Sequence, residues 1–315
     1  MYRIGVDLGG TNIAVGLVDE SMALVAKKST PTLAKRPAEE IVADMAALCF
    51  ALCQDRGITM ADVASIGIAA PGIADVNTGV VVYSCNLPFR NFPLGDLLAQ
   101  KTGVACVRIA NDANAAALGE AVAGAAKGTK NSVMVTLGTG VGGGVIINGQ
   151  IYSGFNGAAC ELGHMVIETG GVPCACGRRG CFEAYSSATA LARMTREKID
   201  ECRASGRESL MLRAERVSGR TACDAMRAGD AAAKEVYDKY IKYLASGLAT
   251  IINLFEPEVI SLGGGVSGEG QSLIDALLPI VRAEQYGGEL AAKTELRIAK
   301  LGNDAGIIGA AMLGA

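Results

Sequence analysis

The sequence predicts an α/β fold built from two similar lobes. A unit of strand, glycine turn and strand near the N-terminus, IGVDLGGTNIAVGLVD, resembles a second unit in the middle of the chain, VMVTLGTGVGGGVIING. The chain has 315 residues, 50% of them hydrophobic, whereas a single core stops growing at roughly 250–300 residues. We therefore expect an internal duplication, with a ligand cleft between the two lobes.

The first half of the chain begins with strands and continues with a helix. Its first thirty residues are typical of an antiparallel meander, with strands at 4–6, 13–18 and 24–27. From Pro37 the apolar residues recur with helical spacing, until Gly57 stops the pattern. Two buried strands are expected next, at 65–69 and 106–110, and an alanine-rich helix follows the second.

The same order of elements starts again at Ser132. The run VMVTL predicts a strand, GTGVGGG a turn and VIING a returning strand. The pair Asn148-Gly149 predicts a tight hairpin turn into a further short strand. A long helix is expected from about 231 to 254, and two more strands, at 259–262 and 296–299, each precede a helix.

These elements divide between two predicted lobes. We expect residues 1–112 with 303–315 to form the smaller lobe and residues 113–302 the larger one. The charged segment 196–220 has the pattern of a solvated helical excursion within the larger lobe, and the sequence gives it no role.

Charge and composition exclude several classes of partner. The formal net charge is −3 with acids and bases mixed along the chain, so no basic stripe is available for nucleic acid or an anionic membrane. No apolar run reaches the roughly 20 residues of a membrane helix. The chain opens on a strand, so we expect no signal segment and a cytoplasmic location.

The ten cysteines fall into two groups. In a chain of this size we expect a reducing compartment, where scattered cysteines pack in the core and clustered ones bind metal. Cys49 and Cys53, one helical turn apart, illustrate the packing group.

Three glycine turns follow predicted strands, and they lie at 7–12, 138–144 and 263–265. Glycine lets backbone N–H groups approach a phosphate closely, so each turn is a candidate anion site, although a tight turn alone also explains it. The second turn also matches G-x-G-x-x-G, with Glu161 about 20 residues on, as in nicotinamide-binding proteins. That fingerprint must open a helix, whereas these glycines run into a hairpin, so we disfavour a dehydrogenase.

One histidine and three cysteines form a candidate metal site. His164 is the only histidine of the chain, and Cys174, Cys176 and Cys181 follow it within eighteen residues. Zn²⁺ prefers such a Cys₃His tetrahedron in structural sites, and four protein ligands leave no position for a reactive water. We therefore predict a structural zinc.

Four polar residues are candidates for substrate chemistry. Glu161 and Glu183 flank the metal site, which would fix their carboxylates for hydrogen bonds from vicinal hydroxyls; as an alternative they are solvated surface acids. Asp112 follows a buried strand, either as a simple helix cap or as a base for an attacking hydroxyl. Asn111 beside it would orient the same substrate.

The glycine motifs carry a family resemblance. DLGGTN, LGTGVGGG and ISLGGGVS resemble the two phosphate motifs and the adenosine motif of the sugar-kinase, actin and heat-shock chaperone superfamily. The resemblance implies an actin-like ATPase (ribonuclease H-like) fold with duplicated βββαβα units, ATP in the interlobe cleft and closure around substrate. The residues that it assigns to ATP are Asp7, Gly9, Gly10, Thr11, Asn12, Gly138, Thr139, Gly140, Gly142, Gly263, Gly264 and Gly265.

The metal segment narrows the resemblance. ELGH at 161–164 and CACGRRGCFE, which ends at Glu183, closely resemble the ROK family (repressors, open reading frames, kinases) over essentially the whole chain. NLPFRNFPL and FNGAACELGH are most similar to its bacterial ATP-dependent glucokinases. By this resemblance Asp112 is the catalytic base, and the residues that contact the hexose are Gly72, Asn111, Asp112, Glu161, His164 and Glu183.

The implied reaction is transfer of the ATP γ-phosphoryl group to a hexose, at the 6-OH if the sugar is glucose. Asp7 would help hold Mg²⁺, and the loop amides would stabilise charge on the phosphoryl oxygens. Many glucokinases of this group carry a Trp where this chain has Pro88-Phe89. Kinases for mannose, fructose or an N-acetylated amino sugar therefore stay open, as does the use of polyphosphate.

Two further expectations follow from the resemblance. A sugar-responsive repressor of the same family is the alternative function of another class. We disfavour it, because a repressor would need a helix-turn-helix module, whereas this sequence starts at its first strand. We also expect a homodimer or homotetramer.

Overall fold

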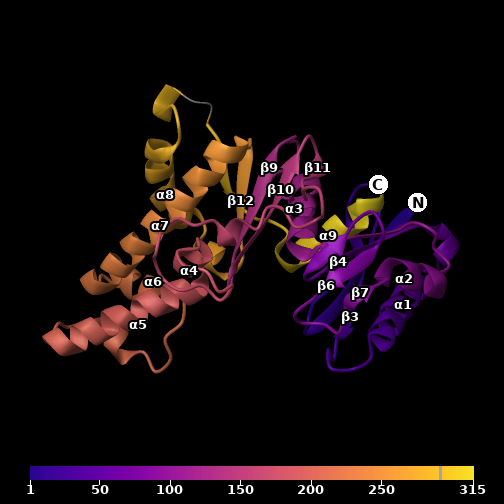
Figure 1. Ribbon diagram of the computed structural model, residues 1–315, viewed down its shortest axis with the longest axis horizontal. Coiled ribbons are helices and arrows are strands. Elements are labelled where there is room, and N and C mark those ends of the chain that lie inside the picture. Colours follow the sequence, from indigo (N-terminus) through magenta and orange to yellow (C-terminus); the bar gives the residue numbers. More distant parts are fainter. Residues whose placement is uncertain (291–292) are drawn as a thin grey trace. The chain divides into compact units, whose positions relative to one another are not determined.

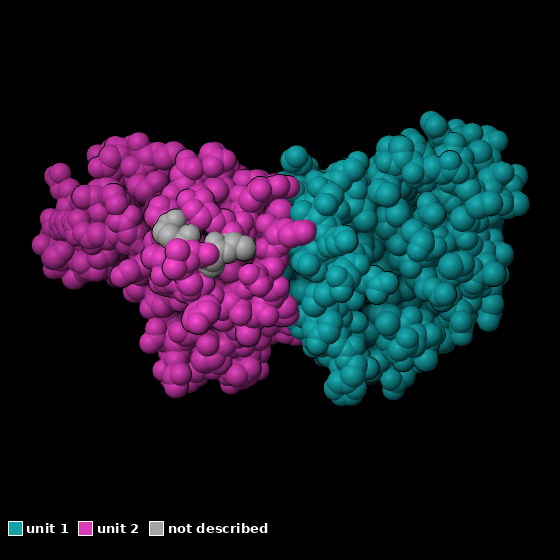
Figure 2. Space-filling view, turned by 90° about the horizontal axis from the view of Figure 1, so that it is seen from above, with its two compact units in different colours: residues 1–134, 144–160, 299–315 teal, residues 135–143, 161–298 magenta. Residues whose placement is uncertain are grey.

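The computed structural model describes residues 1–290 and 293–315 (Figure 1). Contacts divide the chain into two compact units (Figure 2): unit 1 comprises residues 1–134, 144–160 and 299–315, and unit 2 comprises 135–143 and 161–298. Within unit 1, helix α3 (Asp112–Val122) packs against α9 (Ala305–Ala311).

A five-stranded sheet forms the centre of unit 1. Its strands are β1 (Tyr2–Leu8), β2 (Asn12–Val18), β3 (Leu24–Pro31), β4 (Val63–Ala70) and β8 (Val107–Asn111). Their order is β3-β2-β1-β4-β8, with β2 antiparallel to both β1 and β3, and β4 parallel to both β1 and β8. The predicted meander is thus confirmed, and β1, β4 and β8 end at the same edge of the sheet.

The two faces of this sheet are covered differently. Ile4 and Val6 of β1 point toward α1 (Ala38–Asp55) in a large apolar core. On the other face a Cβ at Gly5 would lie 1.8 Å from the Ile307 carbonyl oxygen of α9. Only glycine permits that close approach, so Gly5 lets α9 pack directly against β1, the strand that carries Asp7.

The remaining elements of unit 1 are short. Helix α2 (Leu94–Thr102) packs against α1 and β8. A three-stranded sheet consists of β5 (Ile73–Asp75), β6 (Val80–Tyr83) and β7 (Arg90–Phe92). The sequence pattern did not predict these elements, because strands of three or four residues between turns show too little periodicity.

The second five-stranded sheet repeats the order of the first. Its strands are β9 (Ser132–Leu137), β10 (Val141–Ile147), β11 (Gln150–Ile151), β12 (Val259–Gly263) and β13 (Glu295–Ile298). Their order is β11-β10-β9-β12-β13, with β10 and β11 antiparallel and β12 and β13 parallel. This correspondence confirms the duplication inferred from the sequence.

Helices make up most of unit 2. They are α4 (Glu183–Ser186), α5 (Ala188–Ser205), α6 (Thr221–Arg227), α7 (Ala231–Phe255) and α8 (Gln271–Glu284). The hydroxyl of buried Tyr240 in α7 donates to the Ser186 carbonyl oxygen at 2.7 Å, which fixes the start of α5. The charged segment 196–220 includes the second half of α5. There Lys198 forms surface ion pairs with Glu201 and with Glu235 of α7.

Two smaller expectations are also met. Cys49 and Cys53 are buried in α1, as predicted for packing cysteines. Across the described residues, no helix has both the length and the apolar character needed to span a bilayer.

Candidate functional site

Two carboxylates lie at the edge of the first sheet where its parallel strands end. Asp7 is the last but one residue of β1, and Asp112 follows β8 as the first residue of α3. In open α/β sheets, ligands bind beyond the carboxyl ends of the strands. The backbone therefore delivers both acids to the edge at which a ligand is expected.

The electrostatics of the two acids are unusual. Burial, and then the nearby negative charge of Asp112, raise the pKa of Asp7 to about 6, although Lys27 acts in the opposite direction. Burial also raises the pKa of Asp112, even though part of this side chain reaches solvent, because protein atoms surround its carboxylate. The oxygens of two neighbouring carboxylates form a donor set that fits Mg²⁺.

Asn111 fixes the start of the helix that carries Asp112. Its Oδ1 accepts hydrogen bonds from the N–H groups of Ala113, at 2.9 Å, and Asn114, at 3.3 Å, so it is the N-cap of α3. Its Nδ2 donates to the carbonyl oxygen of Gly72 at 3.1 Å. Gly72 has φ +101°, and a Cβ there would lie 2.1 Å from the Tyr83 carbonyl oxygen, so no other residue fits. Gly72, Asn111 and Asp112 thus form one cluster.

The first predicted phosphate turn links β1 to β2. The Gly9 N–H donates to the Asn12 carbonyl oxygen at 2.9 Å, while Thr11 and Asn12 are exposed. The buried residue Thr32 holds the turn from outside: its hydroxyl donates to Gly9 O at 2.6 Å and its N–H to Thr11 O at 2.8 Å. Sequence reasoning missed Thr32, and only its place at the end of the third strand of the meander hints at this role.

The second predicted phosphate turn links β9 to β10 in unit 2. The Gly138 N–H donates to the Gly140 carbonyl oxygen at 3.0 Å. Thr189 of α5 was not predicted, yet its hydroxyl donates to Thr139 O at 2.7 Å and anchors the turn. Gly142 lies inside β10 and not in the turn. The glycines therefore lead into a strand, which confirms the argument against a dinucleotide fingerprint.

The third glycine run separates β12 from α8. Gly263 closes β12, and Gly265 opens a 3₁₀ turn at Gly265–Glu269. Gly264 has φ +83° and lies against the backbone of Leu137, at the end of β9. In unit 2 the second and third glycine turns are thus close to one another.

The four predicted metal ligands come together. One ligand atom from each of His164, Cys174, Cys176 and Cys181 lies within 4.8 Å of all the others. The Sγ atoms of Cys176 and Cys181 are 3.7 Å apart, and Cys174 Sγ is 3.8 Å from His164 Nδ1. A tetrahedron with Zn–S bonds of about 2.3 Å has S···S edges of about 3.8 Å, so the cluster fits zinc.

Local backbone structure explains how these ligands converge. Cys174 N–H donates to the Arg178 carbonyl oxygen at 2.8 Å, and Gly177 N–H donates back to Cys174 O at 3.1 Å, which closes a tight knuckle. Gly180 has φ +81°, and a Cβ there would lie 1.8 Å from the Glu168 carbonyl oxygen. His164 ends the 3₁₀ turn Leu162–His164. With Nδ1 directed at the thiols, its Nε2 stays available to another group.

The two predicted glutamates differ in their surroundings. Glu183 is half-buried; its Oε2 accepts from the Val141 N–H at 3.0 Å, and its Oε1 is 3.6 Å from Cys174 Sγ. A Cβ at Gly140 would lie 2.2 Å from Glu183 Oε2. Glu183 thus connects the metal cluster to the second phosphate turn. The side chain of Glu161 is exposed.

The model of one protein family covers nearly the whole sequence, and its description, ROK family, matches residues 3–315. The chain belongs to the ROK family. The metal segment singled out above lies within the matched residues. The solved relatives of this chain include a ROK glucokinase from Streptomyces griseus in complex with glucose and AMPPNP. That structure has a TM-score of 0.78 and 34% identity to this chain, and the match covers 100% of this chain and 99% of that one.

Curated ROK relatives agree with this comparison. A glucokinase from Halalkalibacterium halodurans is 38% identical over 99% of this chain and 94% of its own. A glucokinase from Thermotoga maritima is 38% identical over 98% of this chain and 96% of its own. The fold is accordingly the actin-like ATPase fold of ROK sugar kinases.

Proposed function

We propose that the protein is an ATP-dependent glucokinase, which transfers the γ-phosphoryl group of ATP to the 6-OH of glucose. The observation that carries the proposal is the position of Asp112, at the edge of a sheet that also presents Asp7 and a glycine turn. The full-length similarity to glucokinases supports it. Phosphoryl transfer needs this combination of a base, oxygen donors for a cation and backbone amides for phosphate.

Asp112 acts as the general base. Its carboxylate accepts the proton of the attacking hydroxyl as the bond from that oxygen to the γ-phosphorus forms and the bond to the ADP oxygen breaks. Because burial raises its pKa, Asp112 is a stronger proton acceptor than an ordinary aspartate. Asn111, held by Gly72, orients the sugar beside it.

Glucose is recognised by the two glutamates and the imidazole of the metal segment, and by Gly72, Asn111 and Asp112. We assign Glu161, Glu183 and the Nε2 atom of His164 to hydroxyl groups of the sugar, since carboxylates accept strong hydrogen bonds from them. Structural zinc held by His164 and the three cysteines would fix the positions of these groups.

The nucleotide is bound by the glycine turns. Amides of residues 9–12 and 138–140 stabilise charge on the phosphoryl oxygens, and residues 263–265 border the adenosine. A magnesium ion held through Asp7 would neutralise charge on the β- and γ-phosphates. A cytoplasmic location, where ATP and reduced thiols are available, and a homodimer or homotetramer complete the proposal. The predicted division into lobes at residues 112 and 303 stays a prediction.

A panel of sugars tests this function. Glucose, mannose, fructose, N-acetylmannosamine and N-acetylglucosamine are each supplied with ATP, and ADP release is coupled to NADH oxidation. We expect glucose to give the highest kcat/KM, and phosphorus NMR of the product should show a 6-phosphate. A higher kcat/KM for another hexose would reassign the substrate within the family, and no turnover with any sugar would refute the kinase proposal.

A further inference from the structure

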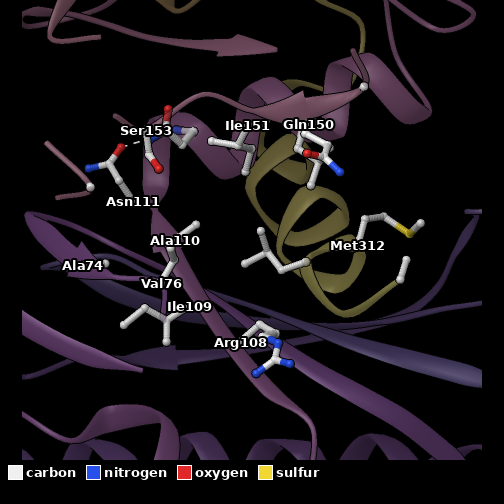
Figure 3. Close-up of a pocket in the computed structure, with 16 residues that line it drawn as sticks. Ala74, Val76, Arg108, Ile109, Ala110, Asn111, Gln150, Ile151, Ser153 and Met312 are labelled. Carbon is white, nitrogen blue, oxygen red and sulfur yellow. Dashed lines mark hydrogen bonds between the residues drawn. The ribbon is translucent and has the colours of Figure 1, made fainter. Parts of the chain in front are cut away.

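Helix α9 lies against three other elements of unit 1, namely α3, β1 and β4. Figure 3 shows the segment that follows α9, with Met312, in the wall of a cavity of about 350 Å³ that Ile109 and Ala110 of β8 also line. The first turn of α9, at the other end of the helix, holds Gly306 beside the carboxylate of Asp7. One end of α9 thus borders a cavity, and the other end borders a residue of the proposed cation site.

The two glycines of α9 have different neighbours. A Cβ at Gly309 would lie 1.7 Å from the Ala115 carbonyl oxygen of α3, so the close approach of the two backbones requires glycine there. A Cβ at Gly306 would lie 3.0 Å from Oδ2 and 3.1 Å from Cγ of Asp7, and its three nearest atoms all belong to this carboxylate. Glycine within a helix is less stable than alanine, so a helical glycine needs a reason. Backbone packing is the reason at Gly309, whereas the nearest neighbour of Gly306 is a functional side chain.

The charges around Asp7 leave a role for a bound cation. Lys27 favours the ionised form of Asp7, but its Nζ also forms an ion pair with Oδ1 of Asp304, at 2.5 Å. Asp112 adds a second negative charge nearby. Mg²⁺ is usually bound through one or two carboxylates and keeps several of its waters. A carboxylate in this role faces a hydrated ion, so the space around its oxygens matters.

We propose that Gly306 is a positioning residue for the divalent cation, because its missing side chain leaves the Asp7 carboxylate open to hydrated Mg²⁺. A methyl group at this position would contact the carboxylate, exclude water from that side of it and push it away from its present position. Gly306 acts through Asp7 and does not touch the ion. The inference rests on the proposed function, which gives Asp7 its part in holding Mg²⁺, but binding of the ion is measurable without sugar or nucleotide.

Gly306→Ala tests the inference, with Mn²⁺ as the probe because electron paramagnetic resonance measures the free ion. Zinc-loaded protein is titrated with Mn²⁺ in the absence of nucleotide, and Mg²⁺ is then added as a competitor. We expect the Mn²⁺ dissociation constant to rise about tenfold in the variant, as for other residues that orient a metal ligand. Gly268→Ala adds the same methyl group in a 3₁₀ turn of unit 2, where no atom beyond its chain neighbours lies within 4 Å, and should leave the constant unchanged.

Steady-state kinetics separate positioning of the ion from a general loss of structure. In Gly306→Ala the Mg²⁺ concentration that gives half the maximal rate should rise about tenfold, whereas KM for glucose should stay close to that of the unmodified protein. Thermal unfolding checks that the variant is folded. A parallel rise in both constants would show that the whole site is distorted, which would overturn the proposal.

Asp7→Asn keeps the inference testable if Gly306→Ala does not fold. This variant removes the charge that Gly306 leaves accessible, so Mn²⁺ binding should weaken at least as much. Retained Mn²⁺ affinity in Asp7→Asn, an unchanged dissociation constant in Gly306→Ala, or no Mn²⁺ binding by the unmodified protein at millimolar concentrations would each overturn the proposal. The expected Mn²⁺ results without phosphorylation of any sugar would support the ion site and refute the kinase.

Discussion

The two five-stranded sheets share one strand order, yet only the first carries acids where its strands end. Asp7 in VDLGG corresponds to Thr136 in VTLGT, and Asn111-Asp112 in VRIAND, at the end of β8, corresponds to Lys300-Leu301 in LRIAKL, just after β13. The duplicated backbone therefore provides turns for phosphate in both halves, whereas the groups that handle protons and cations are specific to one half. A repeated fold does not imply a repeated site.

The acids of unit 2 are held in place differently from those of unit 1. Asp7 and Asp112 sit at strand ends that the hydrogen bonds of the sheet fix in place. Glu161 precedes the 3₁₀ turn Leu162–His164 and Glu183 opens the short helix α4, and the segment between them holds four potential metal ligands and glycine turns in place of a sheet. Unit 1 is thus expected to keep its geometry without metal, and unit 2 to lose it.

The largest effect is expected from Asp112→Asn. Asparagine keeps the shape of the side chain but accepts no proton, so kcat should fall about 10³-fold, or about 4 kcal/mol in transition-state stabilisation. Steady-state kinetics measure the loss, and thermal unfolding checks the fold. A kcat within tenfold of the unmodified protein would remove Asp112 from its role as base.

Cys181→Ser tests whether the geometry of unit 2 depends on a bound metal. Cys181 is fully buried in the cluster, so loss of its thiolate should release zinc and lower the free energy of unfolding by about 3 kcal/mol, as for other lost metal sites. Metal analysis and chemical denaturation measure both effects. Cys202→Ser, which alters a buried cysteine of α5 away from the cluster, should retain zinc. Equal zinc content in the two variants would exclude the cluster as the binding site.

The substitution Asp7→Thr gives the first sheet the residue type that the second sheet has at the corresponding position, Thr136. The folded protein binds the Asp7 proton with a pKa of about 6, against 3.8 for the free group. Ionised Asp7 therefore lowers stability above pH 6, by roughly 2 to 3 kcal/mol at about 1.4 kcal/mol per pKa unit. We expect the variant to be more stable than the unmodified protein at pH 7.5, measured without added Mg²⁺, and this gain to shrink as pH falls from 6 to 4. A gain that does not vary with pH would contradict the raised pKa.

The sequence predicted the order of strands and turns and the cluster of potential metal ligands better than the contacts of individual side chains. Alternating strands, glycine turns and Cys spacing are local signals, so the meander and the ligands of the cluster were found. Thr32 and Thr189 were missed, because their bonds to Gly9 and Thr139 join segments 23 and 50 residues apart. Such contacts arise only when the chain folds.

The smallest effect concerns the hairpins that close the two meanders. Asn148 and Gly149, in the β10–β11 turn, have φ values of +53° and +77°, which these residues tolerate. Met22, in the β2–β3 turn, has φ +67°, a left-handed conformation that costs a residue of its type about 1–2 kcal/mol. Met22→Asn should therefore raise the free energy of unfolding by about 0.5–1 kcal/mol, after loss of the partly buried methionine contacts. Asn148→Met, the reverse exchange in the other sheet, should lower the free energy of unfolding by a similar amount. Urea denaturation measures both changes. If the two midpoints moved in the same direction, the two turns would not be equivalent.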